Sequence, residues 1–387
     1  MRKKIKVGIL VSHPIQYYVS IYRELSRDPL IDLLVIYRSK IGVNSYHDSG
    51  FNRIVKWDIP LLSGYRYIFL SDKLTSSGVE FNIIKELIQE RFDVIIVQGY
   101  SAPTYLIAIM ISKIIGTKIL MRGDTWLRDY HLKGFFKRTF KILLFKFIDG
   151  FLSIGTLNAE YYKVHGVPDK RLFFAPFSID NKFFLMNDSD RLKSRIGLRN
   201  KLNINESKIC VLFVAKLIPL KRADDLIQAF YNVNNKLLNL HLIVVGSGGE
   251  LIKLQNLADS LSISDISFVG FKNQSELPAF YSASDIFVLP SNDESWGLVV
   301  NEAMASGLPV IVSNQVGASK DLVENKGTGY IFPCGDINEF SKALFNLASS
   351  EADRVEMGIR AKNLISNWDS NECAKQFSST IQFILSK

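Results

Sequence analysis

Short apolar runs rich in β-branched residues alternate with amphipathic stretches twice over along the 387 residues of this chain. Such runs, when turn-forming residues bound them, are typical of buried strands in a parallel sheet. Strands that alternate with helices predict doubly wound α/β units, so we expect the chain to form two of them. The predicted strands are Ile5–Val11, Leu33–Tyr37, Val94–Gln98, Lys118–Met121 and Phe151–Ile154 in the first series, and Ile209–Val214, His241–Val245, Ile266–Val269, Ile286–Leu289 and Val310–Val312 in the second.

A polar, charge-rich segment with little apolar periodicity, Asn181–Ser207, separates the two series. We therefore predict an N-terminal Rossmann-like domain over residues 1–180, a linker region over 181–207 and a C-terminal Rossmann-like domain over 208–368. A last helical pattern follows over residues 369–387. Ligands of open parallel sheets bind beyond the carboxyl ends of the strands, so the two domains are expected to face each other across a cleft that holds the site.

Composition and targeting signals narrow the class of protein. The three cysteines are widely spaced and lack histidine partners, which predicts neither a disulfide framework nor a metal site and fits a reducing cytoplasm. The basic start resembles that of a signal peptide, but its apolar run ends at Ser12-His13-Pro14 with no small-residue cleavage site. The longest apolar run, Tyr105–Ile115, is too short to span a bilayer.

The basic excess of the chain lies entirely in its first half. Residues 1–180 hold 26 Lys and Arg against 16 Asp and Glu, a net charge of +10, whereas the remainder holds 21 against 22, a net charge of −1. This asymmetry predicts an anionic partner for the first half. Leu132–Phe147 is a basic amphipathic stretch with five cations and five phenylalanines, which favours an anionic membrane surface as that partner. The alternative is an ordinary helix whose core-facing residues are Phe136, Phe140, Leu143, Leu144 and Phe147.

Two glutamates, Glu294 and Glu302, lie eight residues apart in the second half. The predicted strand Ile286–Leu289 leads into a polar turn, and a nearly apolar helix then runs up to Pro309. A carboxylate within such a helix requires hydrogen-bond donors. The two glutamates lie ~12 Å apart along the axis and ~80° apart around it, so they cannot share one proton. The spacing instead suits one long ligand that is held at both ends.

The start of the same helix predicts the chemistry of that ligand. Unpaired N–H groups and the positive dipole end near Ser295–Leu298 form an anion site. A sugar nucleotide carries a diphosphate between a ribose and a sugar. Glu302 would then accept hydrogen bonds from the ribose hydroxyls, and Glu294 would accept them from the hydroxyls of the sugar. The alternative is structural, because Ser291 and Glu294 also match a capping box.

This segment resembles the Glu-x7-Glu signature of the retaining glycosyltransferases of family 4, which have the GT-B fold. The resemblance implies that Glu302 binds the donor and that Glu294 positions the sugar and stabilises charge at its anomeric carbon. It also implies donor contacts at Gly297 and Leu298, a final helix that crosses back onto the first domain, and transfer without a metal or other cofactor. The leaving phosphate would assist attack on the same face of the sugar.

Two lysines follow the first strand of the second half, in Val214–Ala223. The family pattern here is Gly-Arg-Leu…Lys-Gly, in which Lys216 takes the place of the Arg, Lys221 that of the Lys, and Ala215 that of the Gly. Lysine supplies the charge of arginine without its bidentate grip on phosphate. The resemblance implies that both lysines stabilise the departing diphosphate. The alternative is a solvated basic turn.

Further donor contacts are predicted at Gly246, Phe271 and Lys272. Gly246 opens a Gly-x-Gly turn after a strand, but Leu251 stands where a dinucleotide-binding fingerprint has its third glycine, which disfavours an NAD enzyme. Phe271 and Lys272 lie in a segment that resembles the one bordering the nucleotide base. Gly317 matches a glycine of the family pattern Gly-Gly-x-x-Glu, whereas Ala318 and Asp321 depart from that pattern, and we assign no function to those two.

The first half matches the family less well. His13 and Gln16 follow the first strand, and we predict that they contact donor or acceptor, with organisation of the turn as the alternative. Asp124 follows a later strand and is predicted to contact the sugar or acceptor, with a structural pair to Arg122 as the alternative. Phe174–Asp180 resembles the turn that ends the first domain and is predicted to be hinge structure.

The resemblance therefore implies a hexosyltransferase-type enzyme, EC 2.4, that moves a sugar from a UDP- or GDP-linked donor to a glycan or lipid-linked acceptor. The expected setting is bacterial surface polysaccharide synthesis (lipopolysaccharide O-antigen, capsule or exopolysaccharide) at the inner face of the plasma membrane, with no nucleic-acid partner. Two alternatives remain: a GT-B-fold nucleotide-sugar epimerase, and a catalytically silent, membrane-associated partner of another transferase. The presence of Glu294, Glu302 and Lys221 weighs against the silent partner.

Overall fold

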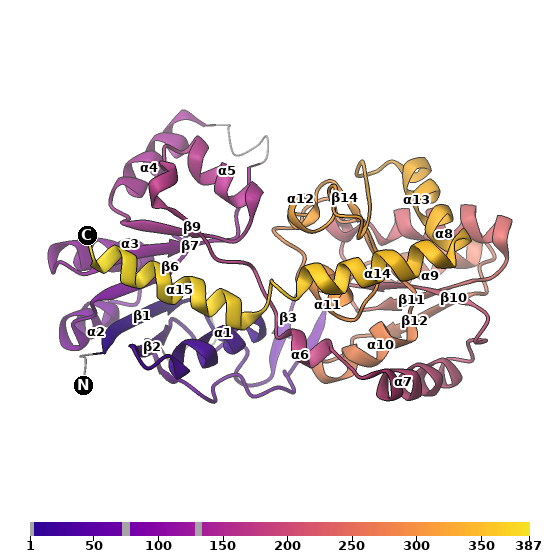
Figure 1. Cartoon of the computed structure of the whole chain (residues 1–387), viewed down its shortest axis with the longest axis horizontal. Helices are drawn as coiled ribbons and strands as arrows, with labels where there is room; N and C mark the ends of the chain where they lie inside the picture. Colours follow the sequence, from indigo (N-terminus) through magenta and orange to yellow (C-terminus); the bar gives the residue numbers. More distant parts are fainter. Residues whose placement is uncertain (1–3, 72–77, 128–133) are drawn as a thin grey trace. The chain divides into compact units, whose positions relative to one another are not determined.

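The computed structural model of the chain describes residues 4–71, 78–127 and 134–387. The chain divides into two compact units, each built around one parallel sheet (Figure 1). The first unit comprises residues 1–46, 59–179 and 368–387, and the second unit comprises residues 47–58 and 180–367.

The first unit contains a seven-stranded sheet with parallel neighbours. Along β1, Val7, Ile9 and Val11 face one hydrophobic core and Leu10 faces the other, which is the two-residue period of a strand buried on both faces. In spatial order the strands are β5 (Arg66–Phe69), β2 (Ile31–Tyr37), β1 (Ile5–Val11), β6 (Val94–Gln98), β7 (Lys118–Arg122), β8 (Gly150–Ser153) and β9 (Leu172–Phe174).

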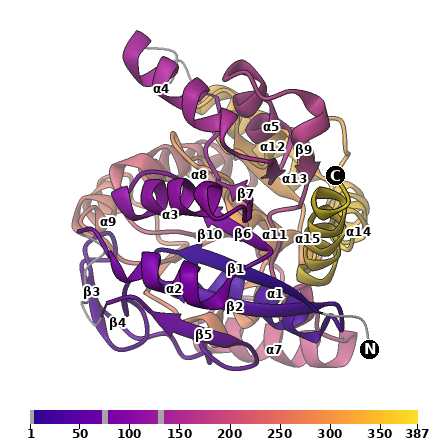
Figure 2. The same ribbon diagram turned by 90° about the vertical axis from the view of Figure 1, so that its left-hand side faces the viewer.

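Helices cover both faces of this sheet, so the predicted doubly wound architecture is confirmed. One core contains residues of α1 and α15, and the other contains residues of α2, α3, α4 and α5. The helix α15 packs on α1, which confirms that the last helix returns to the first unit (Figure 2). The helices are α1 (Gln16–Arg27), α2 (Asn82–Glu90), α3 (Pro103–Ile114), α4 (Phe135–Lys146), α5 (Thr156–Val164), η2 (Asp169–Arg171) and α15 (Ser370–Leu385).

The second unit contains a six-stranded parallel sheet. In spatial order its strands are β12 (Ile266–Gly270), β11 (Leu240–Val245), β10 (Ile209–Val214), β13 (Ile286–Leu289), β14 (Val310–Ser313) and β15 (Gly329–Phe332). Its helices are α6 (Asn181–Phe184), α7 (Asp188–Lys201), η3 (Pro219–Lys221), α8 (Ala223–Leu237), α9 (Leu251–Ser260), η4 (Gln274–Glu276), α10 (Leu277–Ala283), α11 (Leu298–Ala305), α12 (Ser319–Leu322), α13 (Ile337–Ser349) and α14 (Glu351–Ile365).

The division into units differs in two places from the boundaries that the sequence suggests. Residues 181–207, expected as a linker region, contain α6 and α7 and belong to the second unit. The helix α7 packs through charge rather than an apolar stripe, because Arg195 and Arg199 both bind the carboxylate of Asp285, at 2.9 and 2.7 Å. A two-stranded hairpin, β3 (Tyr46–Asp48) and β4 (Arg53–Val55), also belongs mainly to the second unit.

Among the residues that the structure describes, no helix combines the length and the apolar character needed to cross a bilayer.

Candidate functional site

Four of the residues predicted for the second-half site follow neighbouring strands of one sheet. Phe271 follows β12, Gly246 follows β11, Lys216 follows β10 and Glu294 follows β13, and these strands are adjacent in that order. Because the strands are parallel, their carboxyl ends lie at one edge of the sheet. The topology therefore brings these side chains to the place where open α/β sheets bind ligands.

The helix α11 begins at this edge, with a glycine as its N-cap residue. Gly297 precedes its first residue, Leu298, with φ of 94°, a left-handed conformation that favours glycine. The capping-box alternative is wrong for this helix, because its N-cap residue is Gly297 and not Ser291. The amides at the start of a helix can donate to an anion.

Glu294 binds Lys221 in an ion pair between side chains that are 16% (Lys221) and 20% (Glu294) exposed. Backbone contacts fix the loop that carries it: Gly317 N donates to Glu294 O at 3.0 Å, and Asn292 N donates to Leu220 O at 2.8 Å. The second contact joins the Glu294 loop to η3, which ends at Lys221. The structure thus brings together two residues that the sequence separates by 73 positions.

Glu302 lies within α11, and its side chain is fully buried. The hydroxyl of Tyr281 donates to Glu302 Oε2 at 2.7 Å, and Gln274 Nε2 lies 3.4 Å from Oε1. These contacts compensate the cost of burying a carboxylate. The sequence indicated that Glu302 needs such donors, but it did not identify Tyr281 or Gln274.

Lys216 binds Asp48, a residue that sequence analysis did not single out. Its Nζ lies 2.9 and 3.0 Å from the two carboxylate oxygens of Asp48, and 4.8 Å from the centre of the Phe51 ring. Burial by itself would raise the pKa of Asp48, but hydrogen bonds from Lys216 and from the backbone amides of Phe51 and Gly50 together hold it below its ordinary value.

Gly246 occupies a position that only glycine fits, because a Cβ there would lie 1.8 Å from Ala215 O. Phe271 packs against the hairpin: the centre of its ring lies 4.9 Å from that of Phe51 and 4.8 Å from the guanidinium carbon of Arg53. The remaining predicted residue, Lys272, lies 3.3 Å from a carboxylate oxygen of Glu276.

In the first unit, a cavity of about 290 Å³ lies at the carboxyl ends of β1, β6 and β7. Asp124 lines it, together with Gln98 and several tyrosines. Burial raises the pKa of one of these, Tyr18, well above its ordinary value, and the negative charge of Asp124 adds to this effect. The cavity thus combines aromatic walls with a carboxylate, which suits the apolar face and hydroxyl groups of a sugar.

The other first-unit predictions have different surroundings. The described residues that line the cavity include neither His13 nor Gln16. His13 Nδ1 lies 2.9 Å from Ser12 Oγ, and burial lowers the pKa of His13. Gln16 is the first residue of α1. Arg122 donates from Nη1 to Ala175 O at 2.9 Å, in the segment predicted to be hinge structure.

The basic amphipathic helix α4 exposes an apolar stripe. Leu132 and Lys133 of the predicted stretch lie outside the described residues. The helical alternative placed five apolar residues in the core, and it is wrong for four of them, because only Leu144 is buried. The exposed four recur at helical spacing on one face, with exposed fractions of 87% for Phe136, 48% for Phe140, 52% for Leu143 and 51% for Phe147.

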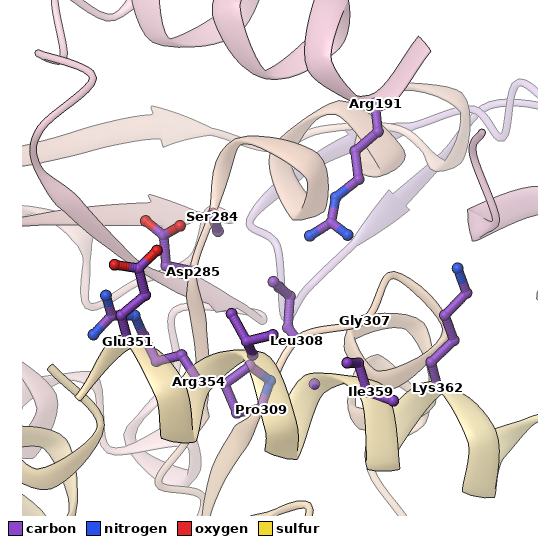
Figure 3. Close-up of a pocket in the computed structure, with 12 residues that line it drawn as sticks. Arg191, Ser284, Asp285, Gly307, Leu308, Pro309, Glu351, Arg354, Ile359 and Lys362 are labelled. Carbon is purple, nitrogen blue, oxygen red and sulfur yellow. The ribbon is translucent and has the colours of Figure 1, made fainter. Parts of the chain in front are cut away.

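A groove of about 300 Å³ lies in the second unit between α7 and α14 (Figure 3). Arg191 from α7 and Lys362 from α14 extend toward it, and Gly307–Pro309 forms part of its wall. Gly307 follows the C-terminal end of α11, so the groove lies at the opposite end of that helix from Glu294. None of the predicted site residues is among its described lining residues.

The family model for glycosyl transferases group 1 matches residues 194–364, which lie within the second unit. The match covers less than half of the chain, so it shows a similarity of the second unit to this family. The match includes all second-half residues of the site described above, namely Lys216, Lys221, Gly246, Phe271, Lys272, Glu294, Gly297, Leu298 and Glu302.

Curated relatives align with this chain over part of their length. The N-acetyl-alpha-D-glucosaminyl L-malate synthase of Bacillus anthracis is 30% identical over 188 residues, which are 48% of this chain and 47% of the relative. The GDP-mannose-dependent alpha-(1-6)-phosphatidylinositol monomannoside mannosyltransferase of Mycobacterium tuberculosis is 28% identical over 198 residues, which are 47% and 51%. The aligned part of the chain thus spans about half the length of these relatives.

Solved structures share the fold of this chain over nearly its whole length. The sucrose-phosphate synthase of Thermosynechococcus elongatus superposes with a TM-score of 0.73 at 17% identity, covering 99% of this chain and 100% of the other. Anabaena Alr3699/HepE in complex with UDP and glucose superposes with a TM-score of 0.73 at 17% identity, covering 98% and 100%. The fold is GT-B, with two Rossmann-like domains, as the sequence predicted.

Proposed function

We propose that this chain is a retaining glycosyltransferase, EC 2.4, that transfers a sugar from a UDP- or GDP-linked donor to a glycan or lipid-linked acceptor. The observation that carries the proposal is that Lys216, Lys221 and Glu294, the last two joined in an ion pair, follow the strands β10 and β13 at the edge of the sheet where α11 begins. Similar proteins support a nucleotide-sugar donor, since the M. tuberculosis relative is named as GDP-mannose-dependent and the Anabaena structure contains UDP and glucose.

In the proposed donor complex the diphosphate binds the N-terminal amides of α11 and the ammonium groups of Lys216 and Lys221. Glu302 is assigned to the ribose hydroxyls, and the loop of Phe271 and Lys272 to the base. The lysines supply positive charge at the phosphates, so the reaction is proposed to proceed without a metal ion.

The proposed transfer breaks the bond between the anomeric carbon and the diphosphate oxygen. The acceptor hydroxyl forms its new bond on the same face of the sugar, and its proton passes to the departing diphosphate. Lys216 and Lys221 stabilise the negative charge that develops on the leaving group. Glu294 binds the sugar hydroxyls once the diphosphate competes for Lys221, and it stabilises positive charge at the anomeric carbon.

The first unit is proposed to bind the acceptor and the membrane. The cavity at Asp124 is the proposed acceptor pocket, with His13 and Gln16 as further contacts. The exposed stripe of α4 carries the phenylalanines into an anionic lipid surface, and the positive charge of residues 1–180 adds to the attraction. A peripheral position at the inner face of a bacterial membrane, in surface polysaccharide synthesis, follows from these two features.

Two alternatives predict different products. A nucleotide-sugar epimerase of the same fold would convert the donor into another nucleotide sugar with no acceptor present. A catalytically silent partner would neither hydrolyse nor transfer the donor. Analysis of the nucleotide and sugar products after incubation with a nucleotide sugar, with and without acceptor, separates all three functions.

The first test is calorimetric titration of UDP and GDP into the wild type and Glu302→Gln. We expect one nucleotide to bind, and the variant to bind it about tenfold more weakly because a charge-assisted hydrogen bond is lost. Glu356→Gln removes one charge from an exposed part of α14 and serves as the matched control. If the wild type binds neither nucleotide, the proposed donor site is wrong and the silent-partner alternative is favoured.

A further inference from the structure

The hairpin His47–Asp58 belongs by its contacts to the second unit, although residues 1–46 and 59–179 on either side of it belong to the first. We propose that this hairpin is a latch on the donor site, in which Asp48 occupies Lys216 until the donor diphosphate displaces it. The inference rests on the proposed function, because it assigns a regulation to the same donor site.

The contact between Asp48 and Lys216 resembles the one that a phosphate would make. Both carboxylate oxygens lie within 3.0 Å of Lys216 Nζ, so the lysine is already charge-compensated. The backbone amides of Gly50 and Phe51 donate to Asp48 Oδ1 at 2.9 and 3.0 Å and hold the carboxylate in this orientation. A phosphate group that binds Lys216 must therefore replace a preorganised anion.

The hairpin is shaped to let Lys216 reach Asp48. A Cβ on Gly50 would lie 2.6 Å from Lys216 Cδ and 3.0 Å from its Nζ, so any larger residue there would displace the lysine. Gly248 is also closely packed, since a Cβ there would lie 2.3 Å from Leu217 O and 2.9 Å from Gly50 O. The contact between Lys216 and Asp48 thus depends on Gly50, whereas Gly248 allows the backbone of the hairpin to approach the loop after β11.

Further contacts hold the rest of the hairpin on the residues predicted to bind the donor. Ser247 Oγ donates to Phe51 O at 2.9 Å, next to Gly246. Asn273 Nδ2 donates to Lys56 O at 2.7 Å, close in sequence to Phe271 and Lys272. These two hydrogen bonds do not involve Lys216, so they keep the hairpin on the glycine turn and the base segment when the Asp48–Lys216 pair is broken.

Competition between Asp48 and the diphosphate follows from charge. Lys216 has one ammonium group, and a diphosphate presents more negative charge to it than a single carboxylate does. Donor binding and the Asp48–Lys216 pair are consequently antagonistic, and each favours release of the other. A variant that weakens the pair should bind diphosphate groups more tightly, without any change in its affinity for a nucleoside that lacks phosphate.

The test uses Asp48→Asn in the full chain, since the asparagine Oδ1 still accepts from the Gly50 and Phe51 amides. Calorimetric titrations with pyrophosphate, UDP and uridine compare it with the wild type. We expect pyrophosphate and UDP to bind the variant about fivefold more tightly, which is the size of a partly exposed ion pair, and uridine affinity to stay unchanged. The gain should vanish when Lys216→Gln is added, and Glu356→Gln should produce no gain.

The outcomes separate the latch from the proposed function. If pyrophosphate binds Asp48→Asn no more tightly than it binds the wild type, including the case in which it binds neither, the latch is overturned. An equal gain in Glu356→Gln would show a general charge effect and would also overturn it. If neither UDP nor GDP binds but Asp48→Asn tightens pyrophosphate binding, the latch stands and the proposed function fails.

Discussion

Gly317 lies where the loop after β14 meets the loop that carries Glu294. A Cβ at this position would lie 2.1 Å from Ser295 O, and backbone atoms cannot accommodate that distance without moving. We therefore expect Gly317→Ala to shift the Glu294 loop and to lower the free energy of unfolding by about 1–3 kcal/mol, the usual cost of overpacking. UDP affinity should fall in the same variant. Urea unfolding and calorimetric titration measure the two effects.

Gly249→Ala is the matched control for this prediction. It lies in the loop after β11, and a Cβ there would meet no atom within 4 Å. Both its stability and its UDP affinity should equal those of the wild type. Wild-type UDP affinity in Gly317→Ala would show that the Glu294 loop does not need its present position to bind the nucleotide.

The chemistry of single residues could be predicted from the sequence where it depends on neighbours in the chain. An apolar helix around Glu302 indicated that its carboxylate requires donors, and the structure supplies Tyr281 and Gln274. Their identity could not be predicted, because they lie 21 and 28 residues away on other elements. The pairing of Lys216 with Asp48 spans 168 positions and has no sequence pattern at all.

The exposed apolar face of the helix α4 leads to a prediction about membrane binding. Its exposed stripe includes Phe136 and Phe140, whose rings would enter the lipid interface. We expect the double variant Phe136→Ser, Phe140→Ser to bind anionic vesicles at least about tenfold more weakly, because two aromatic side chains no longer leave water. Its stability should change little, since both rings are already exposed. Cosedimentation with phosphatidylserine-containing vesicles measures the binding.

Phe345→Ser is the control, because Phe345 is a partly exposed phenylalanine on α13 of the second unit. It should leave vesicle binding unchanged. Equal binding of the wild type to neutral and anionic vesicles, or undiminished binding of the double variant, would contradict a role for α4 at an anionic membrane.

Strands and helices could be predicted where burial imposes a regular spacing of apolar residues on the sequence. All ten predicted strands are present, and nine of them are central parallel strands, which are apolar on both faces; the tenth, β12, lies at a sheet edge. The sheet-edge strands β5, β9 and β15 were missed, since they are short and only partly buried. The helix α7 was read as linker because arginines that bind Asp285 replace the apolar stripe expected of a packed helix.

At the scale of the whole molecule, the division into units could be anticipated only in part. Two series of strands predicted two doubly wound domains, and the return of α15 to the first unit agrees with the family resemblance. The transfer of His47–Asp58 to the second unit could not be foreseen, because a short polar hairpin has no apolar pattern that selects one sheet over another.

Three histidines distributed over both units link the stability of the molecule to pH. Burial lowers the pKa of His13 and His165 in the first unit and of His241 in the second. His165 is almost fully buried, and its Nδ1 lies 2.7 Å from Tyr161 O. In each case the unfolded chain binds a proton more readily than the folded chain, so the free energy of unfolding decreases as the pH falls below the ordinary histidine pKa of about 6.5.

We therefore expect the unfolding midpoint in urea to fall between about pH 7.5 and pH 5.5, with each linked histidine contributing up to about 1.4 kcal/mol per pH unit. Asp48, whose pKa is also lowered, loses its contribution only at more acid pH, below about 4, so the two effects separate along the pH axis. His165→Gln should flatten the histidine-linked slope, because it removes one of the three buried imidazoles. A midpoint that stays constant over this range would mean that the three imidazoles reach water in the folded state, contrary to the burial that lowers their pKa values.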